Sequence, residues 1–94
     1  MKTVVQISKK AEKQIDKAPI EIIESIIEWV SMIETIGLEQ VRKNGGKGLH
    51  DEALKGKLRG TRSIRLNKAW RLYYKEERNE VILVNIIRID KHEY

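Results

Sequence analysis

The sequence contains no cysteine, which excludes disulfide bonds, thiolate metal sites and a cysteine nucleophile together. A small secreted domain is normally stabilised by disulfides, so the expected compartment is the reducing cytoplasm. The chain has 94 residues, enough for one domain over residues 1–94 with one compact core. So short a chain has little material for a deep pocket, which favours an extended ligand bound across its surface.

Long apolar runs are absent as well. No stretch approaches the roughly 18–20 apolar residues that a membrane-spanning helix requires. The first residues, MKTVV, lack the apolar run and the small-residue cleavage site of a signal peptide. We therefore expect no membrane partner and no export signal.

Positive charge is concentrated in one part of the sequence, within a net charge of +5. Residues 41–75 contain eleven Lys or Arg and only two acidic residues, Asp51 and Glu52. By contrast, residues 19–37 contain four glutamates and neither Lys nor Arg. A charge run is often only a solvated surface, but this asymmetry favours a phosphate-rich partner for one half of the molecule.

The first half of the sequence predicts one strand and two helices. Residues 3–7 are β-branched and typical of a strand, and Ser8 is the expected N-cap of a helix over residues 9–17. Pro19 begins a second helix, which Gly37 ends, and residues 38–43 are compatible with a further helical turn. The apolar positions that recur at helical spacing in the second helix are Ile20, Ile23, Ile26, Ile27, Val30, Ile33 and Ile36, widened by Ile22 and Trp29.

The second half predicts strands. Residues 61–67 and 70–75 alternate in polarity and are joined by a short connection, which indicates a hairpin. After a turn at residues 77–80, residues 81–87 are nearly all apolar, which predicts a central strand covered on both faces. The order is β-α-α-β-β-β. The expected fold class is α+β, with two N-terminal helices packed on one face of a small antiparallel sheet.

Alternation places cationic and aromatic side chains on the face that the helices leave open, where they could bind phosphates and stack bases. The hairpin contributes Arg65, Arg71, Tyr73 and Lys75. Near the end of the chain follow Arg88, Lys91, His92 and Tyr94. Each residue alone also has an ordinary explanation, as a solvated cation, a surface histidine or a frayed end.

Other chemistries lack their residues. The sequence has no P-loop and no G-x-S-x-G elbow, and we expect no carboxylate pair inside the basic cluster. His50 beside Asp51 and Glu52 is only a weak indication of a metal, so no metal or cofactor is expected. What remains is phosphate chemistry performed by cations, a histidine and a tyrosine.

Residues 54–74, LKGKLRGTRSIRLNKAWRLYY, resemble the core motif of the RelE/ParE toxin superfamily. The motif's aromatic–Arg–aliphatic–x–Tyr element falls on residues 70–74. The ending KHEY at residues 91–94 is similar to the close of one RelE/HigB-like branch, the mRNA interferases of type II toxin–antitoxin systems. With the order of elements, the likeness covers nearly the whole chain.

The resemblance implies a toxin that is neutralised by a cognate antitoxin and that enters the ribosome to cleave mRNA, meeting operator DNA only through the antitoxin. It implies catalytic roles for Arg65, Arg71, His92 and Tyr94. The expected RNA-binding residues are Lys55, Lys57, Arg59, Arg62, Tyr73, Lys75, Arg88 and Lys91. The two lysines that RelE carries in the second strand are replaced by Arg62 and Arg65, which stay protonated, so the general base is left open.

The implied reaction is attack of the RNA 2′-hydroxyl on the adjacent phosphorus, with arginines stabilising the phosphate charge and His92 transferring a proton. Two other functions remain open on the same scaffold. One is a ParE-like inhibitor of DNA gyrase, a binding protein without nuclease activity. The other is an inactive module that only binds its antitoxin and operator DNA.

Overall fold

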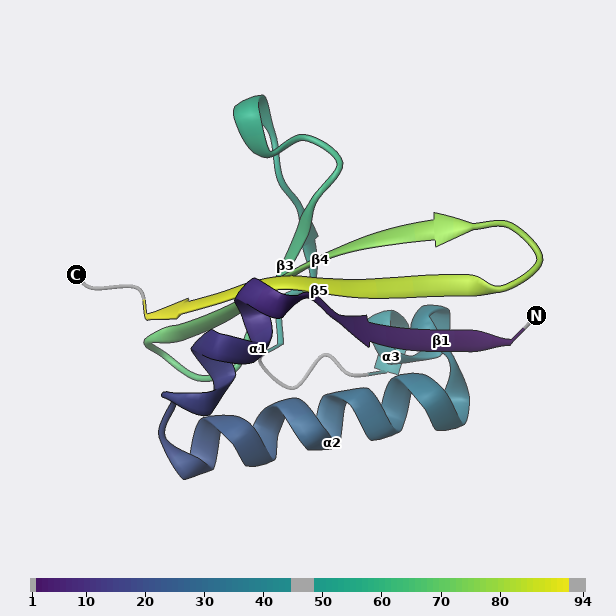
Figure 1. The fold of residues 1–94 in the computed structure, drawn as a ribbon. Helices are drawn as coiled ribbons and strands as arrows, with labels where there is room; N and C mark the ends of the chain where they lie inside the picture. The colour runs from purple at the N-terminus through teal and green to yellow at the C-terminus, as the bar shows by residue number, and fades with distance from the viewer. Residues whose placement is uncertain (1, 45–48, 92–94) are drawn as a thin grey trace.

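The computed structural model describes residues 2–44 and 49–91 and has the predicted α+β architecture (Figure 1). The elements are β1 (Thr3–Ile7), α1 (Lys9–Asp16), α2 (Ile20–Ile36), α3 (Leu38–Asn44), β2 (Glu52–Ala53), the 3-10 turn η1 (Gly56–Leu58), β3 (Arg62–Arg65), β4 (Trp70–Arg78) and β5 (Ile82–Lys91). Helices α1 and α2 lie on the same side of the sheet. None of the helices in the described residues is long and apolar enough to cross a membrane.

The sheet has five strands in the order β1-β5-β4-β3-β2. Strand β1 is parallel to β5, whereas the other neighbours are antiparallel. The expectation of a purely antiparallel sheet is therefore wrong. The chain crosses back over the sheet through the helices between β1 and the remaining strands, and such a crossover allows β1 to pair with β5 in the same direction.

The ends of the helices follow the local signals in the sequence. The Ser8 side chain accepts a hydrogen bond of 3.1 Å from the Ala11 amide, which confirms Ser8 as the N-cap of α1. Pro19 caps α2, and Gly37 ends it with its N–H bonded to the Ile33 carbonyl at 3.0 Å. Helix α2 therefore keeps a fixed length and direction beneath the sheet.

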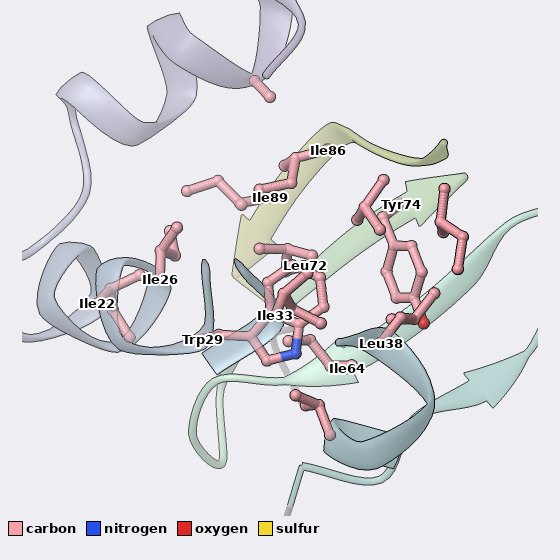
Figure 2. Packing of buried hydrophobic residues seen from close by; sticks show 14 residues of the cluster. Ile22, Ile26, Trp29, Ile33, Leu38, Ile64, Leu72, Tyr74, Ile86 and Ile89 are labelled. Atoms are coloured by element: carbon pink, nitrogen blue, oxygen red, sulfur yellow. The ribbon is translucent and has the colours of Figure 1, made fainter. Parts of the chain in front are cut away.

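The core forms where α2 and α3 meet the helix-facing side of the sheet (Figure 2). Ile22, Ile26, Trp29 and Ile33 line the buried face of α2. The predicted apolar face of α2 is therefore only partly right, since three of its members, Ile20, Ile27 and Ile36, are exposed. The buried line has the spacing i, i+4, i+7, i+11, which keeps large side chains against the strands.

Strand β5 lies between β1 and β4, as expected of an interior strand. The expectation that both its faces are covered is wrong, because Ile82, Val84, Ile86 and Ile89 are buried while the intervening residues are more exposed. The change from even to odd buried positions coincides with a register shift between Tyr73 and Tyr74 of β4. This bulge leaves Ile87 without a register partner. The residues that follow it therefore point to the opposite faces of the sheet from those that regular alternation would give them.

Candidate active site on the open sheet face

Two arginines face each other on the side of the sheet opposite the core. Arg65 of β3 and Arg71 of β4 are register partners, so their side chains leave the same face. Arg65 is exposed and forms no ion pair with any described residue, whereas the Arg71 side chain is only 20% exposed. Like charges opposite each other are unfavourable in a sheet. The pair therefore forms a small cationic site that an anion would stabilise.

The next row of this face combines Tyr73, Arg88 and Asp90. Tyr73 is the register partner of Arg88, whose guanidinium carbon lies 5.5 Å from the centre of the Tyr73 ring. Asp90 accepts a hydrogen bond of 3.4 Å from the Tyr73 hydroxyl and forms a 2.9 Å ion pair with Arg88. Burial and the charge of Asp90 raise the Tyr73 pKa against the opposing charges of Arg88 and Arg71, so this phenol stays protonated.

The bulge explains why Arg88 belongs to this site. If the regular pairing of β4 and β5 continued past Tyr74, Arg88 would face the core and Ile89 would face solvent. With one extra residue in β5, Arg88 and Asp90 join Arg71 and Tyr73 instead. Strand alternation alone could not assign Arg88, since its orientation depends on a residue that the ladder skips.

Glu52 brings a carboxylate to the same face. It is the register partner of Ser63, which is in turn the partner of Tyr73. The Glu52 side chain is 62% exposed, and its Oε1 lies 4.0 Å from Nη1 of Arg71. We expected no carboxylate pair inside the basic cluster, and the structure brings two single carboxylates to it, Glu52 near Arg71 and Asp90 with Arg88. Strand β2 has only two residues, too few for a periodicity to reveal it.

Other predicted RNA-binding residues lie at the margins of this face or beyond it. Lys75 is exposed on the same side, opposite Asn85. Lys91 pairs with Trp70 and so falls on the other side, at the end of the sheet. Lys55, Lys57 and Arg59 are exposed around η1, at the tip of an arm that rises from the sheet away from α2 (Figure 1).

Arg62 does not belong to the open face. Its register partner is the buried Tyr74, and its Nε donates a 2.6 Å hydrogen bond to Oδ1 of Asp51. Adjacent strand residues alternate, so Arg62 points away from the face that carries Arg65.

His92 and Tyr94, the other predicted catalytic residues, lie outside the described residues. Within the described ranges 2–44 and 49–91 there is no cluster of three potential metal ligands.

Comparisons with known proteins identify the fold. A YoeB/ParE toxin from Agrobacterium tumefaciens has 18% identity and a TM-score of 0.68, over 99% of this chain and 100% of that chain. A chain of the toxin–antitoxin complex RelBE2 from Mycobacterium tuberculosis has 23% identity and a TM-score of 0.68, over 98% and 100%. A chain of the YoeB–YefM complex from Staphylococcus aureus has 22% identity and a TM-score of 0.67, over 100% of both chains. No family model matches the sequence, and neither does any curated protein sequence.

Matches that span whole chains establish the architecture as that of the small toxins found in toxin–antitoxin complexes. The chain therefore shares its fold with these toxins, and this is the fold that the resemblance to the RelE/ParE toxin superfamily implies.

Proposed function

We propose that this protein is the toxin of a type II toxin–antitoxin system and acts in the cytoplasm as an endoribonuclease on mRNA. The observation that carries the proposal is the Arg65–Arg71 pair on the open sheet face, with Glu52 beside it. Two opposed guanidinium groups suit a phosphodiester, and an adjacent carboxylate supplies the base that two arginines cannot. The fold shared with known toxins supports the same proposal.

In the proposed reaction, the 2′-oxygen of the RNA attacks the adjacent phosphorus. The bond from phosphorus to the 2′-oxygen forms and the bond to the 5′-oxygen breaks, which leaves a 2′,3′-cyclic phosphate and a 5′-hydroxyl. One group removes the proton from the 2′-hydroxyl, and another delivers a proton to the departing 5′-oxygen. Arg65 and Arg71 bind the phosphate oxygens and stabilise the added negative charge of the transition state. No metal ion or cofactor takes part.

The proton-transfer roles divide between Glu52 and His92. Glu52 is the proposed general base, since its carboxylate lies on the open face next to Arg71. His92 stays the proposed proton donor, because an imidazole titrates near neutral pH. Tyr73, held by Asp90 and Arg88, offers a ring for base stacking. Tyr94 stays a proposed second stacking residue.

The proposed partners are the ribosome, mRNA and a cognate antitoxin. The cations of the arm at residues 55–59 are exposed on the arm that rises from the sheet away from α2, which suits contacts with ribosomal RNA (Figure 1). Some of the matching structures are complexes of a toxin with its antitoxin. An antitoxin that covers Arg65 and Arg71 with acidic side chains would block the phosphate site, and operator DNA would be reached only through that antitoxin.

Purified protein added to ribosomes that carry a defined mRNA tests this function. We expect cleavage within the ribosome-bound codon, a new 5′-hydroxyl end and no loss of activity in a chelator. The same mRNA without ribosomes shows whether the ribosome is required. If the mRNA stays intact under both conditions, the nuclease proposal is wrong.

One match is described as a YoeB/ParE toxin, which keeps gyrase inhibition as the second candidate function. In that case the protein inhibits supercoiling by purified gyrase and leaves ribosome-bound mRNA intact. Loss of both activities, with binding to an antitoxin retained, indicates an inactive module. A supercoiling assay run beside the cleavage assay therefore separates the three functions.

A further inference from the structure

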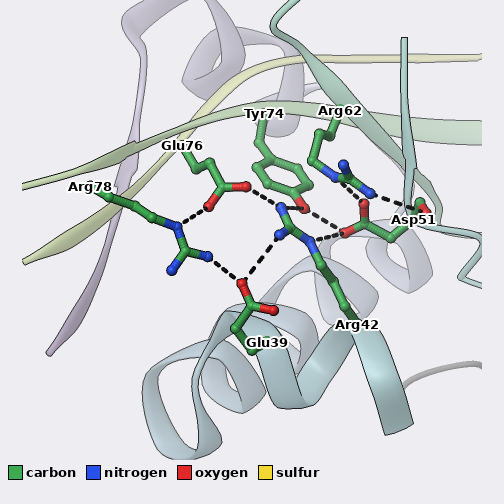
Figure 3. Close-up of polar contacts among 7 residues, drawn as sticks. All are labelled: Glu39, Arg42, Asp51, Arg62, Tyr74, Glu76 and Arg78. Atoms are coloured by element: carbon green, nitrogen blue, oxygen red, sulfur yellow. Dashed lines mark hydrogen bonds and ion pairs between the residues drawn. The ribbon is translucent and has the colours of Figure 1, made fainter. Parts of the chain in front are cut away.

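A cluster of charged side chains lies behind the candidate active site, on the helix-facing side of the sheet (Figure 3). It joins α3, the residue before β2, β3 and β4 through hydrogen bonds and ion pairs. Its members are Glu39, Arg42, Asp51, Arg62, Tyr74, Glu76 and Arg78. None of them faces the Arg65–Arg71 pair, so the proposed reaction does not use them directly.

Asp51 is the centre of this cluster, and its side chain is only 10% exposed. Its Oδ1 accepts a 2.6 Å hydrogen bond from Arg62, and its Oδ2 accepts one from the Tyr74 hydroxyl. Arg42 adds an ion pair, with its Nε 3.7 Å from Oδ2. Arg62 also donates to the Asp51 backbone carbonyl at 3.5 Å. Residue 51 is therefore fixed at both its side chain and its backbone.

The donors to Asp51 are themselves held in place. Tyr74 is fully buried, and its ring packs on Trp29 with the ring centres 5.3 Å apart. Burial and the hydrogen bond to Asp51 raise the Tyr74 pKa, which keeps the phenol protonated and able to donate. Arg42 donates to Tyr74 at 3.1 Å and also to Glu76. Asp51 thus meets rigid partners from α3, β3 and β4.

This anchoring matters because Glu52 follows Asp51 directly. Strand β2 consists of Glu52 and Ala53 only, paired with Ser63 and Arg62 at the edge of the sheet. So short an edge strand has few backbone hydrogen bonds to fix its position. Consecutive strand residues point to opposite faces, so fixing Asp51 on the core side directs Glu52 toward Arg71.

We propose that Asp51 and Tyr74 are positioning residues. They hold Glu52 beside Arg71, so that its carboxylate can take the proton from the 2′-hydroxyl of RNA whose phosphate Arg71 binds. This inference rests on the proposed nuclease function. It assigns a catalytic purpose to a buried ionic cluster that would otherwise only join α3 to the sheet. Displacement of a reacting group by about 1 Å can reduce a rate by about 100-fold.

The variant Tyr74→Phe tests the inference, because it keeps the ring against Trp29 and removes the hydroxyl that binds Asp51. We expect kcat for cleavage of ribosome-bound mRNA to fall about 10–100-fold, with KM nearly unchanged. In a Glu52→Gln background, the same Tyr74→Phe change should have almost no further effect, since it acts through Glu52. The control is Arg78→Gln, which removes ion pairs to Glu39 and Glu76 but none to Asp51.

Hydrogen exchange provides a readout that does not depend on activity. The Leu54 amide donates to the Thr61 carbonyl at 2.9 Å, and the Arg65 amide donates to the Leu49 carbonyl at 2.7 Å. Both bonds secure the segment around β2. Tyr74→Phe should therefore accelerate hydrogen exchange of the Leu54 and Arg65 amides more than that of amides in β5. Arg78→Gln should leave both protected.

The outcomes separate this inference from the proposed function. If the parent protein does not cleave mRNA, the function fails, and exchange alone then decides whether the cluster holds β2. If the parent cleaves but Tyr74→Phe matches it in kcat, the positioning role is wrong. Equal effects of Tyr74→Phe with and without Glu52→Gln would likewise overturn it.

Discussion

Arg71 lies opposite a second arginine on the open sheet face, with Asp90 as its register partner in β5 and Glu52 4.0 Å away, and we propose that it binds the phosphate. We therefore expect Arg71→Ala to reduce cleavage of ribosome-bound mRNA by about 10²–10³-fold, as loss of one donor to a transition-state oxyanion does. The free energy of unfolding should change by less than about 1 kcal/mol, because a like-charged neighbour is removed along with the long contact to Glu52. Single-turnover kinetics and urea denaturation measure the two effects.

Lys13→Ala is the control for Arg71→Ala, since it removes one positive charge from the exposed surface of α1. It should leave cleavage and stability close to those of the parent. A loss of activity that is equal in both variants would mean that net charge matters and that the position of Arg71 does not.

Glu76 should make stability depend on pH. Burial alone would raise its pKa, but the hydrogen bond from Arg42 and the charges of Arg42 and Arg78 outweigh burial, so the pKa lies below its ordinary value of 4.5. A carboxyl with a lowered folded pKa stabilises the fold above its unfolded pKa, and this contribution is lost as pH falls through the folded pKa. Glu76→Gln should therefore cost roughly 1–3 kcal/mol at neutral pH and progressively less below about pH 4.

Urea denaturation of the parent and Glu76→Gln across this pH range measures the difference. A gap in the free energy of unfolding that does not narrow in acid would show that Glu76 stabilises the fold through packing and not through charge.

Strand alternation was enough to place Arg65, Arg71 and Tyr73 on one face, since residues two apart share a side. It could not place Glu52 or Asp90, because their approach to the arginines depends on which strands become neighbours. The RNA-binding role expected for Arg62 came from the family resemblance, and it fails because Arg62 is bonded to Asp51 on the core side. Local pattern thus predicts orientation, whereas long-range pairing decides which side chains meet.

At the scale of elements, the end of α2 depends on the backbone conformation of Gly37. Its φ of 85° and ψ of 157° lie in a region that only glycine adopts without strain. A Cβ there would come no closer than 4.0 Å to Thr3 Oγ1, so the cost of substitution is conformational and not steric. We expect Gly37→Ala to lower the free energy of unfolding by roughly 1–3 kcal/mol.

Gly37→Asn should be destabilised to a similar extent, because asparagine tolerates the left-handed helical region but not this one. The control Ser31→Ala, on the exposed side of α2, should change stability by less than about 0.5 kcal/mol. Thermal and urea denaturation measure all three variants. A parent-like stability of Gly37→Asn would show that the conformation at residue 37 is not required.

The element boundaries show which signals a sequence carries. Ser8, Pro19 and Gly37 act on their immediate neighbours, so the predicted limits of α1 and α2 agree with the structure. The buried side of α2 was misjudged, because isoleucine occurs all round the helix and periodicity alone cannot rank its faces. The parallel β1–β5 pair was missed because its partners are separated by nearly the whole chain.

At the scale of the whole molecule, charge is divided between two surfaces. Helix α2 exposes Glu21, Glu24 and Glu28, whereas the other side of the sheet carries Arg65, Arg71 and Arg88. This separation orients an approaching polyanion, because the field attracts it to the sheet and repels it from the helix.

RNA binding should therefore depend on salt through the cations of the open sheet face and not through the charges of α2. A single-stranded RNA oligomer with 2′-deoxyribose at the scissile position lacks the nucleophile, so it reports binding without cleavage. For single strands, the slope of log K against log salt is about −0.7 for each phosphate neutralised, so Arg65→Gln should make it shallower by about 0.7. Glu24→Gln, which changes charge by the same amount on α2, should leave the slope unaltered. If the two variants gave equal and opposite changes, RNA would be responding to net charge, and the open face would be only a solvated surface.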